Sequence, residues 1–249
     1  EESQGYTDEE YMNVLMNELN KGEQDPYDIY GGEIQYGEEG ESFDDLIPKT
    51  EEFEQDITEE LTTEILEAEV GISDNAILFN SNNKNSYLSN LEMLVNPIVD
   101  ELGLEYYTVE AFYQANKVAN TGDAEKVKQY RKRFAGKKVM DNDKPATNYK
   151  GKEITLTGKW ARKEGKKLPL RNDWAEVRVS VMREAIKQKF DKNPTLRNEL
   201  LNTGNKQLVE YITWRTDDLF WGISSVSRKG SNVTGKLLEE YRKVSSNTE

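Results

Sequence analysis

Three polar side chains of different chemistry lie close together in the segment 108–117, T-V-E-A-F-Y-Q-A-N-K. If this segment is a helix, Glu110, Gln114 and Lys117 lie at positions i, i+4 and i+7 and share one stripe. A carboxylate, an amide and an ammonium in this arrangement can serve a polar pocket. The same arrangement suits a helix face that is exposed to water. The rest of the chain has to decide between these two interpretations.

The composition restricts the chemistry of such a pocket. The 249 residues include no cysteine and no histidine. This excludes thiolate nucleophiles, disulfides, Ser-His-Asp and Cys-His triads, and metal sites built on Cys or His. Acid–base chemistry must therefore come from Asp, Glu, Lys or Tyr. We expect neither a metal nor a cofactor.

Charge divides the chain into two chemically different parts. Residues 1–72 contain 24 Asp/Glu and 2 Lys, a net charge of −22, whereas residues 73–249 contain 23 Asp/Glu and 31 Lys/Arg, a net charge of +8. This split predicts an acidic N-terminal extension followed by a basic domain. The extension is either a solubilising tail or a docking arm, which binds a protein partner or folds back over the basic domain.

The extension is predicted to be partly helical. Amphipathic helices are expected at 8–19 and 51–70, and the Gly- and Glu-rich stretch 21–47 is expected to be extended or disordered. No apolar run is long enough to span a membrane, and the first residues do not resemble a signal peptide. Because the first residue is Glu1 and not Met, we expect the chain to be trimmed, processed or incomplete.

The basic domain is predicted to be an α-rich α+β fold with short β elements. Strands are expected at 77–79, 95–99 and 104–107, and the segment 207–212 is either helical or extended. Helices are expected at 108–120, 124–134, 173–190, 194–201 and 232–244. The free N–H groups at the start of the last helix are a natural seat for an anion.

Residues 141–172 are predicted to be an inserted, solvent-exposed excursion, because Pro145, Gly151, Gly158 and Gly165 punctuate them. Lys and Arg are frequent here and in the helix before it. The basic surface 124–172 is either solvated or a contact for the phosphates of a nucleic acid. Aromatic residues for base stacking are few, which favours the solvated interpretation.

Seven motifs follow one another in the order that is typical of one family. They are L-S-N at 88–90, Y-T-V-E at 107–110 with Y-Q-A-N-K at 113–117, L-R-N-D-W at 170–174, K-F-D-K-N-P at 189–194, L-L-N-T-G at 200–204, D-L-F-W-G at 218–222 and G-S-N-V-T-G-K-L-L at 230–238. The chain from about 77 to 244 thereby resembles the NADAR superfamily, which includes the YbiA-like N-glycosidases. The resemblance implies a compact, α-rich domain that hydrolyses an N-glycosidic bond at the anomeric carbon of a ribose.

The resemblance also implies the residues of the site. The implied catalytic residues are Glu110, Lys117 and Asp218, and the implied substrate-binding residues are Asn90, Gln114, Trp174, Arg178, Trp221, Asn232 and Lys236. A carboxylate stabilises the positive charge that develops on the ribose when the C–N bond breaks. Lys117 then protonates or stabilises the leaving base, or forms a Schiff base with the opened sugar.

The remaining implied residues suit recognition of a nucleotide. Trp174 or Trp221 stacks on the base. Arg178 and the N-terminus of the last helix, near Asn232 and Lys236, bind a phosphate. Without the resemblance, the tryptophans suit a hydrophobic core, Asp218 suits a turn, and Asn232 suits a helix N-cap equally well.

The expected function is hydrolysis of the N-glycosidic bond of an ADP-ribosylated base or a phosphoribosyl-type heterocycle. We expect a cytoplasmic enzyme with a nucleotide-like substrate and no membrane association. The alternative is a non-catalytic binding or assembly protein, such as a processed virion component of a phage, which keeps the fold and docks through its acidic extension.

Overall fold

The computed structural model describes residues 69–118, 123–141, 144–212 and 219–246. The helix predicted at 8–19 and nearly all of the helix predicted at 51–70 lie outside the described residues, so both stay predictions. Residues 1–39 and 40–249 form two separate units, and all described residues belong to the second.

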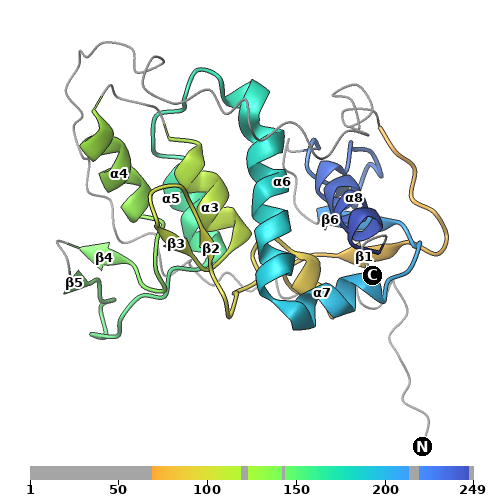
Figure 1. Ribbon diagram of the computed structural model, residues 1–249, viewed down its shortest axis with the longest axis horizontal. Helices are drawn as coiled ribbons and strands as arrows, with labels where there is room; N and C mark the ends of the chain where they lie inside the picture. Colours follow the sequence, from red (N-terminus) through yellow and green to blue (C-terminus); the bar gives the residue numbers. More distant parts are fainter. Residues whose placement is uncertain (1–68, 119–122, 142–143, 213–218, 247–249) are drawn as a thin grey trace, which may run out of the picture. The chain divides into compact units, whose positions relative to one another are not determined.

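Six α-helices and several short strands occur within the described ranges, which confirms the predicted α-rich α+β fold (Figure 1). In chain order they are β1 (Ile77–Phe79), the 3-10 helix η1 (Ser86–Leu88), β2 (Ile98–Val99), β3 (Glu105–Tyr106), α3 (Val109–Asn116), α4 (Ala124–Lys132), β4 (Met140–Asp141), β5 (Lys144–Pro145), α5 (Gly158–Gly165), α6 (Trp174–Lys192), α7 (Pro194–Leu201), β6 (Leu208–Ile212), β7 (Ile223–Ser224) and α8 (Val233–Ser246). The predicted helices at 124–134, 173–190, 194–201 and 232–244 differ from these by no more than two residues at either end.

Helix α3 is buried along its whole length. It begins after Thr108, whose hydroxyl accepts the backbone N–H of Ala111 at 3.0 Å, as a helix N-cap does. It ends at Asn116, with Lys117 as its C-cap, so it is shorter than the predicted helix at 108–120. Burial of both faces rules out the interpretation that its polar stripe faces water.

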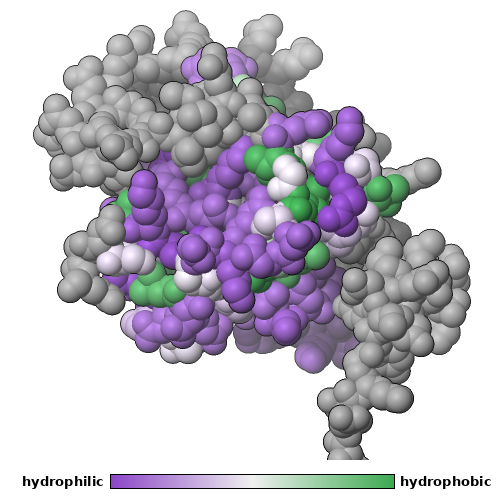
Figure 2. All heavy atoms as spheres, turned by 90° about the vertical axis from the view of Figure 1, so that its right-hand side faces the viewer, coloured by the Kyte–Doolittle hydropathy of each residue, from purple (hydrophilic) through white to green (hydrophobic). Residues whose placement is uncertain are grey.

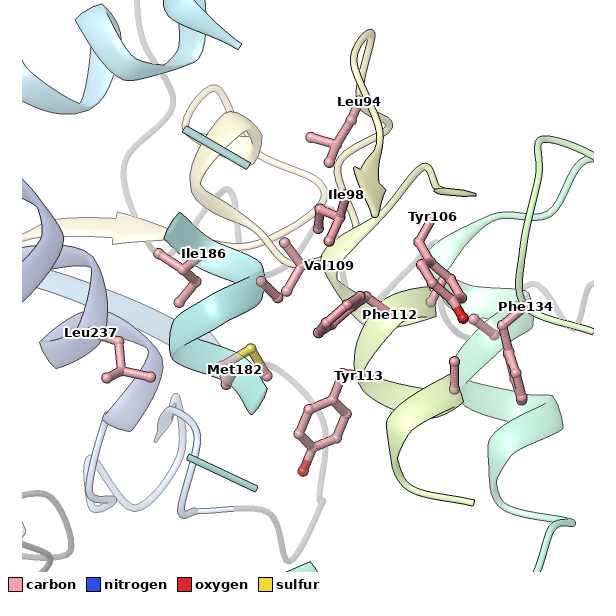
Figure 3. Packing of buried hydrophobic residues seen from close by; sticks show 14 of the residues in the cluster. Leu94, Ile98, Tyr106, Val109, Phe112, Tyr113, Phe134, Met182, Ile186 and Leu237 are labelled. Carbon is pink, nitrogen blue, oxygen red and sulfur yellow. The ribbon is translucent and has the colours of Figure 1, made fainter. Parts of the chain in front are cut away.

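Helix α6 separates two groups of elements, with α3, α4 and α5 on one side and α7, α8, β1 and β6 on the other (Figure 1). Its buried side chains contact both groups. Figure 3 shows Met182 and Ile186 of α6 between Val109 of α3 and Leu237 of α8. These four side chains are at most 2% exposed, and they join the two groups of elements into one hydrophobic core.

The segment 207–212 is extended, which settles the open prediction. Strand β6 pairs in parallel with β1 on one side and with β7 on the other. Its successive residues Leu208 and Val209 are both fully buried, as in parallel strands that are covered on both faces. Strands β2 and β3 form an antiparallel pair, whose turn contains Gly103 at a φ of 73°.

The prediction of a solvent-exposed excursion at 141–172 is wrong for its second half. Strands β4 and β5 are exposed, but Ala161 is fully buried and Leu156 is 1% exposed. Helix α5, which Thr157 caps by accepting the N–H of Trp160 at 3.2 Å, packs against α3. In the sequence, the glycines at both ends of α5 are typical of a loop. In the structure, they permit close packing of this helix.

The surface on the right-hand side of Figure 1 is mostly hydrophilic where its residues are described, and its hydrophobic residues form small separate patches (Figure 2). No helix in the described ranges combines the length and the apolar character that a membrane span needs.

Candidate active site

The carboxylate of Glu110 lies at the centre of the candidate site. Glu110 is 4% exposed and occupies the first turn of α3. Its backbone N–H donates to the carbonyl of Asn90 at 3.0 Å, which joins the start of α3 to the segment after η1. Its Oε1 atom accepts the Nε2–H of Gln114, one turn later, at 2.8 Å. The predicted stripe therefore brings Glu110 and Gln114 together, and the backbone hydrogen bond adds Asn90 to this group.

Arg162 of α5 completes this group, and sequence reasoning missed it. Its Nε donates to Oε1 of Glu110 at 3.3 Å and its Nη2 donates to Oε2 at 3.2 Å. The Arg162 side chain is 50% exposed, whereas that of Glu110 is 5% exposed. The available signal was the N-cap Thr157 followed by Trp160 and Ala161, an amphipathic pattern inside the segment interpreted as a loop.

Four aromatic side chains, which we call the aromatic cluster, contact one another around Tyr113 of α3. They are Tyr113, Trp174, Phe220 and Trp221. The ring of Tyr113 meets that of Trp174 edge-on at a centroid distance of 4.8 Å and that of Trp221 at 5.4 Å. Phe220 packs against Trp221 at 4.8 Å. Tyr113 lies three residues after Glu110 on α3, so one helix carries both the carboxylate and the ring that Trp174 and Trp221 contact.

Arg178 of α6 belongs to the aromatic cluster. Its guanidinium carbon lies 3.7 Å from the ring centroid of Phe220, within the range of a cation–π interaction. Trp174 lies one turn earlier on α6. The segment just before it contacts the end of α3, where the backbone N–H of Arg171 donates to the carbonyl of Lys117 at 3.1 Å. The structure thus brings the predicted residues Trp174, Arg178 and Trp221 together.

Two buried amide oxygens of the site accept no hydrogen bond from the described part of the chain. They are Oε1 of Gln114 and Oδ1 of Asn90, and both residues are 4% exposed. A buried acceptor without a donor costs about 1–3 kcal/mol, so such atoms gather where a ligand supplies the donor. Oδ1 of Asn90 suits a ligand that carries a hydroxyl or N–H group, whereas Oε1 of Gln114 packs against Gly165 of α5.

Comparison with known proteins identifies the family. A family model described as "NADAR domain" matches residues 78–244, two thirds of the chain. The chain belongs to the NADAR family. The NMR structure of the Escherichia coli protein YbiA is 26% identical in sequence, and it covers 71% of this chain and 88% of YbiA with a TM-score of 0.51.

Curated relatives match over shorter stretches of the NADAR domain. "N-glycosidase YbiA" of Shigella boydii is 40% identical over 74 residues, 30% of this chain and 44% of that protein. "Riboflavin biosynthesis protein PYRR, chloroplastic" of Zea mays is 32% identical over 146 residues, 57% of this chain and 20% of that protein. The chain therefore spans less than half the length of these curated relatives.

The side chain of Asn232, which was predicted to bind substrate, makes hydrogen bonds to the backbone of β6. Its Nδ2 donates to the carbonyl of Leu208 at 2.8 Å, and its Oδ1 accepts the N–H of Glu210 at 3.0 Å. The side chain thus hydrogen-bonds β6 through both ends of its amide. Its backbone has a φ of 53°, a left-handed conformation that Asn tolerates better than most residues.

The expected anion seat at the start of the last helix is wrong. The first N–H groups of α8 are already used, because Val233 donates to the carbonyl of Phe220 at 3.0 Å and Thr234 to that of Trp221 at 3.1 Å. These bonds fix the segment that carries the aromatic cluster. Lys236 lies one turn into α8, where burial lowers its pKa and the nearby Glu239 opposes that shift.

The other two predicted catalytic residues are Lys117 and Asp218. Lys117 is half-buried at the C-terminal end of α3, seven residues after Glu110 and on the same stripe. Asp218 lies outside the described residues. Its predicted role remains a prediction.

Sequence reasoning also missed a buried lysine that contacts the segment before Asn90. Lys189 of α6 is 1% exposed, and its Nζ donates to the carbonyl of Ser89 at 2.9 Å. Burial lowers its pKa to about 7, although Glu92 and Glu210 oppose the shift. Lys189 therefore holds the backbone of Ser89, the residue before Asn90, by a hydrogen bond. Across the described ranges, no cluster of three or more Asp or Glu has the arrangement of a metal site.

Proposed function

We propose that this NADAR domain is an N-glycosidase that hydrolyses the bond between a ribose and a nitrogen heterocycle. The observation that carries the proposal is the buried carboxylate of Glu110, which accepts a hydrogen bond from Gln114 and lies three residues before the aromatic residue Tyr113 on α3. A buried carboxylate beside aromatic rings matches the two parts of such a substrate, a sugar that becomes cationic and a planar base.

The reaction follows from the charges that develop. Heterolysis of the C–N bond leaves the electron pair on the base and positive charge on the ribose. Glu110 stabilises that charge, and its effect is large because the surroundings exclude water. The base takes up a proton, for which Lys117 is the proposed donor, and the anomeric carbon takes the oxygen of a water. Asp218 is proposed to orient this water and to accept its proton.

Substrate recognition is proposed to use the rest of the site. Trp174 or Trp221 stacks on the base, and the unpartnered Oδ1 of Asn90 accepts a hydrogen bond from the sugar or the base. The relatives named as an N-glycosidase and as a riboflavin biosynthesis protein favour a nitrogen heterocycle. The net charge of +8 in residues 73–249 favours a phosphate-bearing substrate, either an ADP-ribosylated base or a phosphoribosyl heterocycle.

The test uses ADP-ribosylated guanine DNA and a phosphoribosyl heterocycle as substrates for the wild type and the Glu110→Gln variant. We expect the wild type to release the base from at least one, and Glu110→Gln to be slower by about 100-fold or more in kcat. The matched control is Glu164→Gln, another buried glutamate that pairs with an arginine, Arg133, outside the proposed machinery. No release by the wild type, or equal release by Glu110→Gln, contradicts the proposal.

We further propose that the boundary near residue 72 separates an acidic docking arm from the catalytic domain. The family model begins at residue 78, which supports this position. Removal of residues 1–72 is expected to leave base release intact and to abolish binding of a basic protein or surface. If the truncated chain loses base release, the two parts are not functionally separate.

A further inference from the structure

The two oxygens of the Glu110 carboxylate have different partners. Oε1 accepts from Gln114 at 2.8 Å and from Nε of Arg162 at 3.3 Å. Oε2 accepts from Nη2 of Arg162 at 3.2 Å. Because Gln114 and the buried α3 already hold the carboxylate in place, Arg162 is not needed to position it. Its guanidinium instead covers Oε2.

The contact between Arg162 and Glu110 is loose for an ion pair. Both of its distances exceed the 2.7–2.9 Å that is usual for a charge-assisted N–H to carboxylate bond, roughly by half an ångström. The Arg162 side chain is half exposed, so water and salt screen the pair. Because Glu110 is only 5% exposed, loss of the guanidinium leaves a buried carboxylate with the hydrogen bond from Gln114, so the exchange requires another anion that takes the guanidinium in its place.

Helix α5, which carries Arg162, packs closely on its neighbours. A Cβ on Gly165 would lie 2.0 Å from Oε1 of Gln114, and a Cβ on Gly158 would lie 2.7 Å from Cδ2 of Leu91. These two glycines let α5 pack directly on α3 and on the segment after η1. The long Arg162 side chain extends from this closely packed helix and can change its rotamer.

A guanidinium on Oε2 opposes the proposed chemistry. Its positive charge cancels part of the negative charge with which Glu110 stabilises a cationic ribose. A phosphate on the substrate would draw the guanidinium away, since its fork of N–H donors fits phosphate as well as carboxylate. Residues 124–172, which include α5, hold 16 Lys/Arg and 5 Asp/Glu, a net charge of +11, whereas the rest of 73–249 holds 15 and 18, a net charge of −3. Anions are thus attracted to the part of the domain that carries Arg162.

We propose that Arg162 is a displaceable counter-ion of Glu110, which makes the reaction depend on an anionic group of the substrate. In the free protein Arg162 covers Oε2 and weakens the carboxylate. When a phosphate-bearing substrate binds, the guanidinium moves to the phosphate, and Oε2 faces the ribose. Arg162 is then a specificity-determining residue that selects phosphorylated over unphosphorylated glycosides. The inference rests on the proposed N-glycosidase function.

The test compares one N-glycoside in phosphorylated and dephosphorylated form. The variants are Arg162→Gln, Arg162→Lys and, as a control, Lys166→Gln, which removes the same charge from an exposed position one turn along. We expect Arg162→Gln to raise KM for the phosphorylated form by about 10-fold and to raise kcat for the dephosphorylated form by about 3-fold. Arg162→Lys should keep part of the preference for phosphate, and Lys166→Gln should keep all of it.

Two results overturn the inference while leaving the proposed function standing. Equal loss of kcat on both forms would make Arg162 a positioning residue, and an unchanged ratio of kcat/KM between the two forms would leave it no role in selection. If the wild type releases no base at all, the proposed function fails, and binding of ADP-ribose decides the inference separately. Affinity about 10-fold weaker in Arg162→Gln would support it. Equal affinity, or no binding by the wild type, would overturn it.

Discussion

Gly165 of α5 leaves the space that the side-chain amide of Gln114 occupies, since a Cβ at Gly165 would lie 2.0 Å from Oε1 of Gln114. Gln114 is buried and donates to Glu110, so it cannot yield without breaking that hydrogen bond. The packing of α5 on α3 and the orientation of the proposed catalytic carboxylate are therefore coupled through one glycine.

Replacing this glycine should disturb the site through Gln114. We expect Gly165→Ala to destabilise the protein by about 1–3 kcal/mol and to lower kcat by about 10-fold. In a Gln114→Ala background the clash is gone, and the same substitution should cost less than about 0.5 kcal/mol. Urea denaturation of the four proteins gives the coupling energy. Additive effects would show that the contact is not the cause.

The elements with a local signature were predictable. Pro194 at the first position of a helix marks α7, which starts where expected, and α3 starts one residue after the predicted start of the helix at 108–120. The predicted polar stripe of α3 also put Glu110 and Gln114 in contact, because side chains four residues apart on a helix are neighbours.

The features that failed depend on contacts between distant segments. Residues 141–172 looked like a loop because Gly158 and Gly165 usually interrupt helices, but their lack of a Cβ is what lets α5 pack closely. The start of α8 looked like an anion seat, because no local pattern reveals that the carbonyls of Phe220 and Trp221 take its N–H groups. Arg162 was missed because it lies on α5, inside the segment that was interpreted as a loop.

The two tryptophans of the aromatic cluster should respond differently to substitution. Trp174 is 7% exposed and lies in the core, whereas Trp221 is only half-buried. We expect Trp174→Leu to destabilise the protein by about 3 kcal/mol. Trp221→Leu should cost less stability, but it should raise KM by about 10-fold if the ring stacks on the base, because such stacking contributes about 1–3 kcal/mol. Thermal unfolding and steady-state kinetics separate the two effects, and equal KM in Trp221→Leu and wild type would exclude stacking on this ring.

Asn232 is expected to act on stability more than on substrate affinity. Asn232→Ala removes both hydrogen bonds to β6 and places Ala at a φ of 53°, which should cost about 2–4 kcal/mol. Asn232→Gly removes the same hydrogen bonds but tolerates the backbone, so it should be the more stable of the two. Chemical denaturation of both variants measures this difference. A large rise in KM with unchanged unfolding free energy would instead return Asn232 to the substrate-binding residues.

Lys189 should make the stability of the protein depend on pH in a particular window. Its pKa is lowered by burial to about 7, from 10.5 in the unfolded chain, while its Nζ donates to the carbonyl of Ser89. Between these two values the unfolded state binds more protons than the folded state, so stability rises with pH. The slope from this one group approaches about 1.4 kcal/mol per pH unit, and below pH 7 the group contributes no slope because it is protonated in both states.

Substitution isolates this contribution from those of other groups. Lys189→Met keeps the length and burial of the side chain but removes the titrating amine, so its unfolding free energy should lack the rise that the wild type shows between pH 7 and about pH 9.5. Lys187→Met, on an exposed position of the same helix, should keep that rise. Denaturation at half-unit pH steps measures both differences. The prediction is contradicted if the difference in unfolding free energy between wild type and Lys189→Met does not change with pH. Lys189 would then have the same pKa in the folded protein as in the unfolded chain.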